Sequence, residues 1–259
     1  MIEFTNHLSP YTMGGLILLV FVIVSVVTLV VVRRWCPGLM IDKECEDVGT
    51  IFGTAIGTTF ALVFALVTIA VWQNYDRVAS AVGEEANTIH NIYRYLDAYP
   101  PAVRVPTQQL LRAYLQQMIT HEWPLLTTGQ EDRETHRLIT DINARLVSYR
   151  PDGPAEVPLH SEMLAQISSY RSLRHGRLQS SKAYVDASMW ISLILGSLTL
   201  MVFCSLFRFN NHRQMLIMTV TLGSSLGVVF FLLMAYNHPF AGPEAITAAP
   251  FQSLLDHNW

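Results

Sequence analysis

The sequence predicts an all-α polytopic membrane protein with four transmembrane helices and an α-helical extramembrane domain inserted between helices two and three. Three observations predict this class. Of 259 residues, 51% are hydrophobic and only 14% are charged, against about 25% charged in soluble proteins. Four uncharged apolar runs are each long enough to cross a bilayer, which needs about 20 residues. These runs lack the period-two alternation of a membrane β-strand, so each is predicted to be a helix.

The four runs also divide the chain. They cover residues 13–32, 48–75, 187–207 and 214–236. The first run is interpreted as a retained span, because residues 1–12 carry no Lys or Arg and its apolar core is longer than that of a signal peptide. The expected organisation is 1–73 for helices one and two, 74–184 for the extramembrane domain, 185–236 for helices three and four, and 237–259 for a C-terminal tail.

A heptad-like pattern predicts that the second transmembrane helix continues beyond the bilayer. Steps of four and three separate the residues that define the pattern: Val78, Val82, Glu85, Ile89, Ile92, Leu96 and Tyr99. The helix is expected to end at Pro100-Pro101. A second helix is expected to open near Pro106, and two more follow with apolar faces at 138–146 and 159–173.

Composition and motifs exclude several functions. A net charge of −3 gives no global basic field for nucleic acid. The spans hold no charged residue, which disfavours a proton-coupled transporter or an intramembrane protease. His121-Glu122 is followed by Pro124 instead of the second histidine of a zinc helix, and the three cysteines form no disulfide framework. We therefore expect no enzyme, no cofactor and no metal.

Small residues recur every four positions along the second span. The stripe consists of Gly49, Gly53, Gly57, Ala61 and Ala65. A shorter version, Gly223 and Gly227, lies in the fourth span, where it could pack against the first. Small side chains let helix backbones approach closely in lipid. Two interpretations stay open: packing within one subunit, or a subunit interface around a central axis, with hydroxyl and aromatic side chains facing a pore that selects by constriction.

Basic residues give conflicting indications of orientation in the cell (inner) membrane. The short loops carry Arg33, Arg34, Lys43, Arg208 and Arg213, whereas the two tails carry no Lys or Arg. The positive-inside rule then places the loops in the cytoplasm, and the termini and helical domain on the extracytoplasmic side. A second basic group precedes the third span and opposes this orientation: Arg171, Arg174, Arg177 and Lys182. It is interpreted as a collar at the level of lipid headgroups or as an anion-attracting vestibule.

Several local motifs together resemble one family. They are Trp72 and Tyr75, Glu84-Glu85-Ala86, Glu122-Trp123-Pro124, Trp190, Pro239-Phe240 with Gly242, and Pro250-Phe251. The set is similar to the bestrophin-like family, which comprises mostly bacterial multi-pass membrane proteins, is classed as a domain of unknown function, and distantly resembles the bestrophin anion channels. The resemblance extends over nearly the whole chain.

The resemblance implies a pentameric assembly for small anions, because bestrophins are pentameric anion channels with four spans per subunit. Their second span lines a narrow hydrophobic neck. By this analogy the neck candidates are Phe60, Phe64, Val67 and Val71, and the termini and helical domain are cytoplasmic, against the short-loop count. One motif departs: the acidic calcium-binding run of bestrophins is replaced by a single carboxylate, Glu244. Calcium takes about six or more oxygen ligands, so calcium gating is not expected.

The sequence therefore predicts an oligomeric membrane protein whose second transmembrane helix lines an ion-conducting pore for small anions. The alternative is a non-conducting, membrane-anchored interaction or sensor protein whose helical domain binds a partner or ligand. The expected partners are the lipid bilayer, further copies of the chain and small anions, with no nucleic acid.

Overall fold

The computed structural model describes residues 10–41, 45–151, 153–182, 184–208, 211–242 and 244–256. Within these ranges the protein is all-α, and an isolated parallel bridge between Ile41 and Phe207 is the only extended pairing. The predicted fold class is confirmed. The chain divides into two compact units, which are taken separately below. The first comprises residues 1–74, 184–237 and 242–244, and the second comprises 75–183, 238–241 and 245–259.

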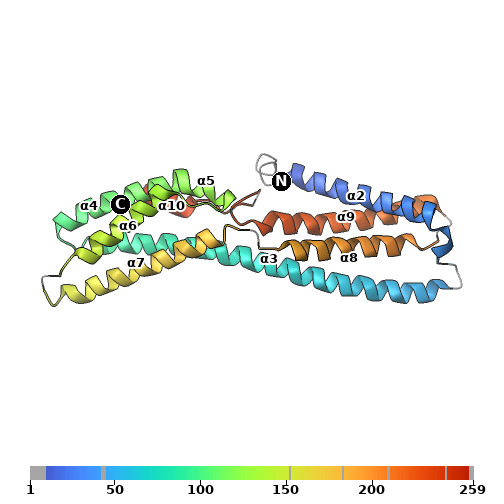
Figure 1. The fold of residues 1–259 in the computed structure, drawn as a ribbon, viewed down its shortest axis with the longest axis horizontal. Helices are drawn as coiled ribbons and strands as arrows, with labels where there is room; N and C mark the ends of the chain where they lie inside the picture. Colours follow the sequence, from blue (N-terminus) through green and yellow to red (C-terminus); the bar gives the residue numbers. More distant parts are fainter. Residues whose placement is uncertain are drawn as a thin grey trace. The chain divides into compact units, whose positions relative to one another are not determined.

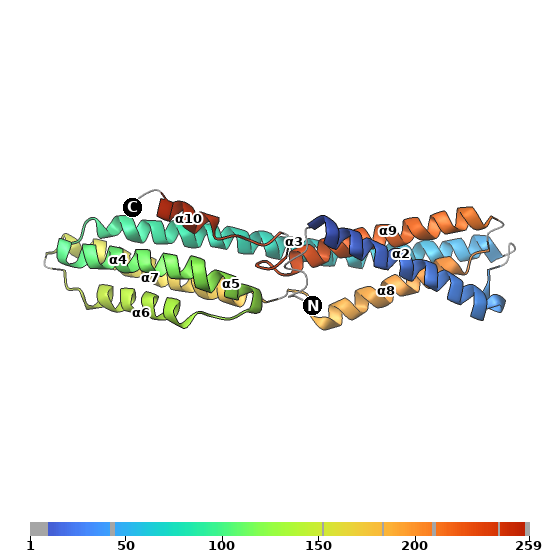
Figure 2. The same ribbon diagram turned by 90° about the horizontal axis from the view of Figure 1, so that it is seen from above.

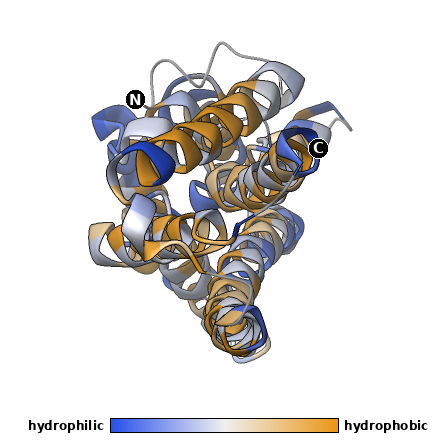
Figure 3. Ribbon diagram, turned by 90° about the vertical axis from the view of Figure 1, so that its right-hand side faces the viewer, coloured by the Kyte–Doolittle hydropathy of each residue, from blue (hydrophilic) through white to orange (hydrophobic). Residues whose placement is uncertain are grey.

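The first unit contains four helices long and apolar enough to cross a membrane. They are α2 (Pro10–Trp35), the N-terminal part of α3 (Glu46–Leu96), α8 (Ala187–Ser205) and α9 (His212–Asn237) (Figure 1). A short η1 (Pro37–Leu39) follows α2. Hydrophobic residues lie on the outward-facing as well as the inward-facing sides of these helices (Figure 3). Large apolar side chains such as Ile51 and Leu62 are 69% and 63% exposed. An apolar surface of this extent is suited to lipid.

Glycines of α9 bring it close to α2. A methyl group at Gly223 would lie 2.9 Å from the carbonyl oxygen of Phe21, and one at Gly227 would lie 3.0 Å from Cα of Leu18. The Ser25 hydroxyl donates a 2.8 Å hydrogen bond to the carbonyl oxygen of Thr219 across the same pair of helices. Any side chain larger than hydrogen at Gly223 would therefore separate the two backbones.

The glycines of the α3 stripe face α8 within the chain. A methyl group at Gly53 would lie 2.6 Å from the Phe203 ring, and one at Gly57 would lie 3.8 Å from Leu200. The fit is reciprocal, because the Phe60 ring of α3 occupies the space beside Gly196 of α8. Of the two interpretations left open by the sequence, these contacts correspond to packing within one subunit. Gly49 likewise lies against Ile41 and Phe207, whereas Ala61 and Ala65 are exposed.

The second unit is a helical bundle built around the C-terminal part of α3 (Figures 1 and 2). Its further elements are α4 (Pro101–Gln117), η3 (Met118–Glu122), α5 (Trp123–Leu125), η4 (Leu126–Thr128), α6 (Arg133–Ser148), α7 (Glu156–Gln179) and α10 (Ala249–Asp256). The predicted continuation of the second span is confirmed, since α3 is a single helix of 51 residues. Helix α4 begins earlier than expected, at Pro101, because proline is well suited to a first helical position. Pro106 lies inside the helix.

The heptad-like seam forms the core of the second unit. All seven of its residues are buried, together with apolar residues of α4, α6 and α7. Asp132 caps α6 by accepting a 2.9 Å hydrogen bond from the backbone N–H of Thr135. Parts of the expected C-terminal tail contribute to this core: Phe240 and Phe251 are buried in it, and α10 packs beside α4.

Candidate functional site

The four neck candidates lie on the side of α3 that packs against the rest of the first unit. Phe64 and Val71 are buried, at 6% and 1% exposure. The Phe64 ring is 5.1 Å from the ring of Phe230 on α9. Phe60 and Val67 are half-buried and pack against the same core. Phe64 and Val71 therefore contact the chain's own helices, and only Phe60 and Val67 have appreciable free surface.

The opposite side of α3 is uncovered and uncharged. Leu62, Leu66 and Ile69 are 63%, 59% and 52% exposed, and their spacing of four and three residues places them on one helical face. The hydroxyl of Thr54 donates to the carbonyl oxygen of Thr50 in the preceding turn, at 2.8 Å. An apolar helical face of this kind requires a covering, either by lipid or by a second protein surface.

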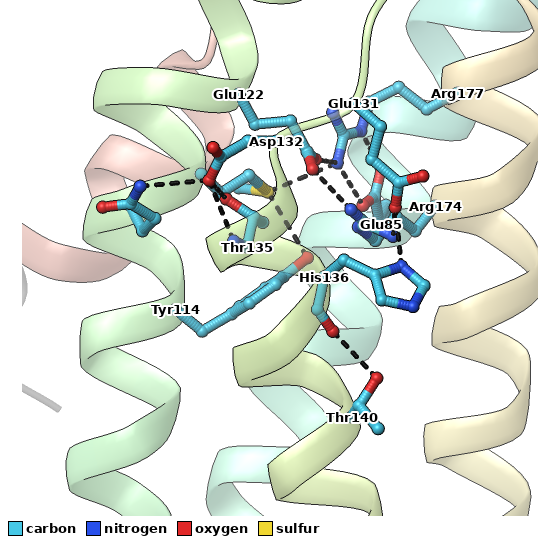
Figure 4. Close-up of polar contacts among 12 residues, drawn as sticks. Glu85, Tyr114, Glu122, Glu131, Asp132, Thr135, His136, Thr140, Arg174 and Arg177 are labelled. Carbon is cyan, nitrogen blue, oxygen red and sulfur yellow. Dashed lines mark hydrogen bonds and ion pairs between the residues drawn. The ribbon is translucent and has the colours of Figure 1, made fainter.

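The second unit contains a buried cluster of charged side chains, centred on Arg177 of α7 (Figure 4). Its Nε donates to Oε2 of Glu85 at 2.8 Å, and its Nη2 donates to Oε1 of Glu85 at 3.1 Å. The same Nη2 donates to Oε1 of Glu122 at 3.0 Å. Neither carboxylate has exposed side-chain surface. Burial alone would lower the pKa of Arg177, but Glu85, Tyr114 and Glu122 together outweigh burial, so that the pKa is raised.

Arg174, one helical turn earlier, extends this cluster towards the surface. Its Nη2 pairs with Oε2 of Glu122, and its Nη1 lies 2.9 Å from Oε1 of Glu131. Glu131 is 42% exposed and also accepts a 2.8 Å hydrogen bond from His136. Burial would raise the pKa of Glu131, but the hydrogen bonds from His136 and Arg174 lower it. The deepest part of the cluster is electrically balanced, with two guanidinium groups against two carboxylates.

A local change of helix type accompanies Glu122 in the cluster. Pro124 has no N–H and its ring crowds the preceding turn, so it disturbs the regular hydrogen bonding of an α-helix at this point. The chain instead forms a five-residue π-helical segment, η3, in which the N–H of Trp123 bonds to the carbonyl oxygen of Met118. The buried side chains of Met118 and Glu122 both come from this segment. A π-helical segment inside a longer helical stretch is frequently found at functional positions.

Two buried tyrosines adjoin the arginines. The hydroxyls of Tyr114 and Tyr170 are 2.5 Å apart, and the Tyr114 hydroxyl is 3.7 Å from Sδ of Met118. Burial, reinforced by the Glu85 carboxylate, raises the pKa of Tyr114. Burial and Tyr114 raise the pKa of Tyr170. Both side chains therefore stay protonated well above pH 10 and act as neutral hydrogen-bonding groups.

Trp123 connects the arginine cluster to the C-terminal segment. The Arg177 guanidinium lies 5.0 Å from the centroid of the Trp123 ring, at cation–π distance. The indole N–H donates to the carbonyl oxygen of Ile246 at 3.2 Å, and the ring packs edge-on against Phe240 and Phe251. Three motifs that are separate in the sequence, around Glu85, Glu122-Trp123 and Phe240 with Phe251, thus meet in one place.

The basic group expected to form a collar divides into two pairs. Arg171 and Lys182 are exposed. Arg174 and Arg177 do not have the expected lipid-contacting or vestibule role, because buried carboxylates neutralise their charges. The spacing in the sequence could have indicated this arrangement. Arg174 and Arg177 follow Tyr170 by steps of four and three residues, which places them on the buried face of α7. The lone carboxylate in the α3 seam, Glu85, provides their partner.

The cluster is suited to holding helices together. In the described part of the chain, no three side chains of the metal-binding types are grouped to hold a metal ion. The buried ion pairs join α3, η3 and α7, and removing one member of such a group leaves an uncompensated buried charge. In the first unit, the exposed apolar face of α3 is a separate feature that could have a function.

Comparison with known proteins identifies the family. The bestrophin-like domain matches residues 19–251, which is most of the chain. The protein belongs to the bestrophin-like family. The resemblance of the scattered Glu, Trp and Pro-Phe motifs to this family is thereby confirmed.

Several solved structures share the fold of this chain. One variant of a bacterial bestrophin homologue from Klebsiella pneumoniae has a TM-score of 0.67 at 13% identity, with 95% of this chain and 97% of that chain covered. A second variant has a TM-score of 0.68 at 16% identity and covers 93% and 97%. A crystal structure described as a membrane protein variant gives 0.68 at 11% identity, covering 95% and 96%. No curated protein sequence gives a significant match.

Proposed function

We propose that this bestrophin-like protein forms an oligomeric, anion-conducting pore in a cell membrane, lined by the uncovered face of α3. One observation carries the proposal: a membrane-length helix has a charge-free apolar face, marked by Leu62, Leu66 and Ile69, which the described part of its own chain leaves exposed. In an oligomer around a central axis, these faces surround a common narrow passage.

Such a passage would select ions by its width and by whether it is filled with water. A constriction lined by leucine and isoleucine has no fixed charge, so a permeant ion crosses it only when the constriction is wide enough to hold water. The assignment to small anions, and the number of five subunits, rest on the resemblance to bestrophins. Phe60 and Val67 border the proposed lining. Phe64 and Val71 lie on the opposite side of α3, where they pack in the core that holds α3 against α9.

The experiment is a flux measurement with purified protein in liposomes. We expect chloride flux from the unaltered protein and a changed rate for Leu66→Ala, which shortens an exposed side chain on the proposed lining. Leu195→Ala on α8 is the matched control, because Leu195 is 57% exposed and Leu66 is 59% exposed. This control should conduct like the unaltered protein.

Two results would contradict the proposal. Liposomes that stay impermeable to all anions tested would favour a membrane-anchored interaction or sensor protein. If Leu66→Ala and Leu195→Ala change the chloride flux equally, the exposed face of α3 does not line the pore. The mass of the assembly in detergent, measured in parallel, should correspond to several copies of the chain.

A further inference from the structure

A pocket of about 670 Å³ opens on the second unit between the end of α3, α4 and α10. None of its lining residues belongs to the buried arginine cluster. Helix α10 lies beside α3 in Figure 2 and also contacts α4. The residues that characterise the pocket are His90, Tyr93, Arg94, Arg104, Val105 and Leu254. Its volume is within the range of small-molecule sites in proteins, about 300–1,000 Å³.

Among the described residues that line the pocket, two arginines outnumber one carboxylate, so the net charge of the lining is positive. Arg94 and Arg104 face a single lining carboxylate, Asp97, which already accepts a 3.2 Å hydrogen bond from Gln108. Among the described residues neither guanidinium has a carboxylate within ion-pair distance. The guanidinium of Arg104 donates a hydrogen bond to the backbone carbonyl oxygen of Asp97, at 3.5 Å. This differs from Arg174 and Arg177, whose charges are both paired.

The walls beside these arginines are apolar. Tyr93 and Leu254 are half-buried and pack against the hydrophobic core of the second unit, so their positions are fixed from behind. Val105 lines the pocket and is 46% exposed. Two guanidinium groups match the geometry of a carboxylate or a phosphate, and an aromatic ring with aliphatic neighbours accommodates a flat or branched apolar body.

We propose that this pocket binds a small organic anion that carries a carboxylate or phosphate group on an aromatic or aliphatic body. The anionic group bonds to Arg94 and Arg104, and the body lies against Tyr93 and Leu254. Because α10 supplies Leu254, the bound anion also joins the C-terminal helix to α3 and α4. The proposal does not depend on ion conduction, since every residue in it belongs to the second unit.

The test is calorimetric titration of the full chain in detergent with three probes that share a ring system. Naphthalene-2-carboxylate and 2-naphthyl phosphate carry the two acid groups, and naphthalene-2-carboxamide is neutral. We expect saturable binding of at least one anion. The affinity for the neutral carboxamide should be lower than that for the anion by about tenfold or more, because the carboxamide lacks the charge-assisted hydrogen bond. The anion with the higher affinity identifies the acid group.

Variants separate the roles of charge and space. The double variant Arg94→Gln/Arg104→Gln should weaken anion binding by about tenfold or more. Val105→Trp keeps both charges but fills the pocket, and should abolish binding. Arg145→Gln, an exposed arginine of α6 outside the pocket, should bind like the unaltered protein. Thermal unfolding midpoints verify that each variant is folded.

Three outcomes would overturn the proposal. The first is that neither anion binds. The second is that the carboxamide binds with the same affinity as the anions. The third is a loss of affinity in Arg145→Gln as large as that in the double variant, which would indicate a general electrostatic effect in place of a site.

Discussion

Both carboxylate oxygens of Glu85 accept hydrogen bonds from Arg177, at 2.8 Å from Nε and 3.1 Å from Nη2, although 92 residues separate them in the chain. Both side chains are essentially without exposed surface. The pair joins the extramembrane part of α3 to the end of α7, which leads towards the third membrane helix.

Replacing Arg177 should destabilise the second unit strongly. Arg177→Met leaves Glu85 without its bidentate partner in a buried position, and breaking such a pair costs about 3–5 kcal/mol. Unfolding by denaturant in detergent, followed by circular dichroism, measures the loss. Arg171→Met on the same helix is the control, because Arg171 is exposed and surface substitutions usually stay within about 0.5 kcal/mol.

The double variant Glu85→Gln/Arg177→Met tests the reason for that loss. It removes one buried negative charge together with the positive one, so it should be less destabilised than Arg177→Met alone. A double variant that loses as much stability as the sum of the two single variants would show that the two side chains act independently.

A methyl group at Gly223 should weaken the packing of α9 on α2. Gly223→Ala places Cβ 2.9 Å from the Phe21 carbonyl oxygen, a backbone atom that cannot move without shifting α2. Overpacking of this kind costs about 1–3 kcal/mol. Gly15→Ala is the matched control, since its added methyl group would lie more than 4 Å from every described atom outside the neighbouring backbone of its own helix and alanine favours a helix. The unfolding midpoint in detergent should fall for Gly223→Ala and stay or rise for Gly15→Ala.

Alkaline pH should destabilise the second unit through Tyr99. Burial, with Tyr149 and Glu156 nearby, raises the pKa of Tyr99 from 10.0 to about 12. The folded state therefore retains a proton that the unfolded state has lost between these values, and its stabilising effect, complete below pH 10, decreases as the pH rises towards 12. Unfolding midpoints measured from pH 9 upwards should fall less steeply for Tyr99→Phe than for the unaltered protein. Identical slopes would show that Tyr99 does not contribute.

The orientation of the protein is predicted from its short loops. Arg33, Arg34, Arg208 and Arg213 border the two short loops, while the tails lack Lys and Arg. The positive-inside rule then places Trp259 outside the cytoplasm, so a fluorescent reporter fused after Trp259 should be dark and a periplasmic enzyme reporter active. A fluorescent fusion would establish the cytoplasmic orientation that the resemblance to bestrophins implies.

Much of the fold followed from local properties of the sequence. Run length determines which segments cross a bilayer, because the thickness of the hydrocarbon core is fixed. The steps of four and three from Val78 to Tyr99 identified the buried face of α3, because helical periodicity places those residues together whatever they contact. The membrane helices, the extension of α3 and the family resemblance were accessible in this way.

Only the tertiary structure decided which faces meet. Hydropathy could not distinguish the side of α3 that carries Phe64 and Val71 from the side that carries Leu62 and Leu66, since both are apolar and lie in the same span. Nor could a charge count show that Arg174 and Arg177 pair with carboxylates of η3 and α3. Such pairings depend on how helices far apart in the chain are brought together in space, which no single segment of sequence determines.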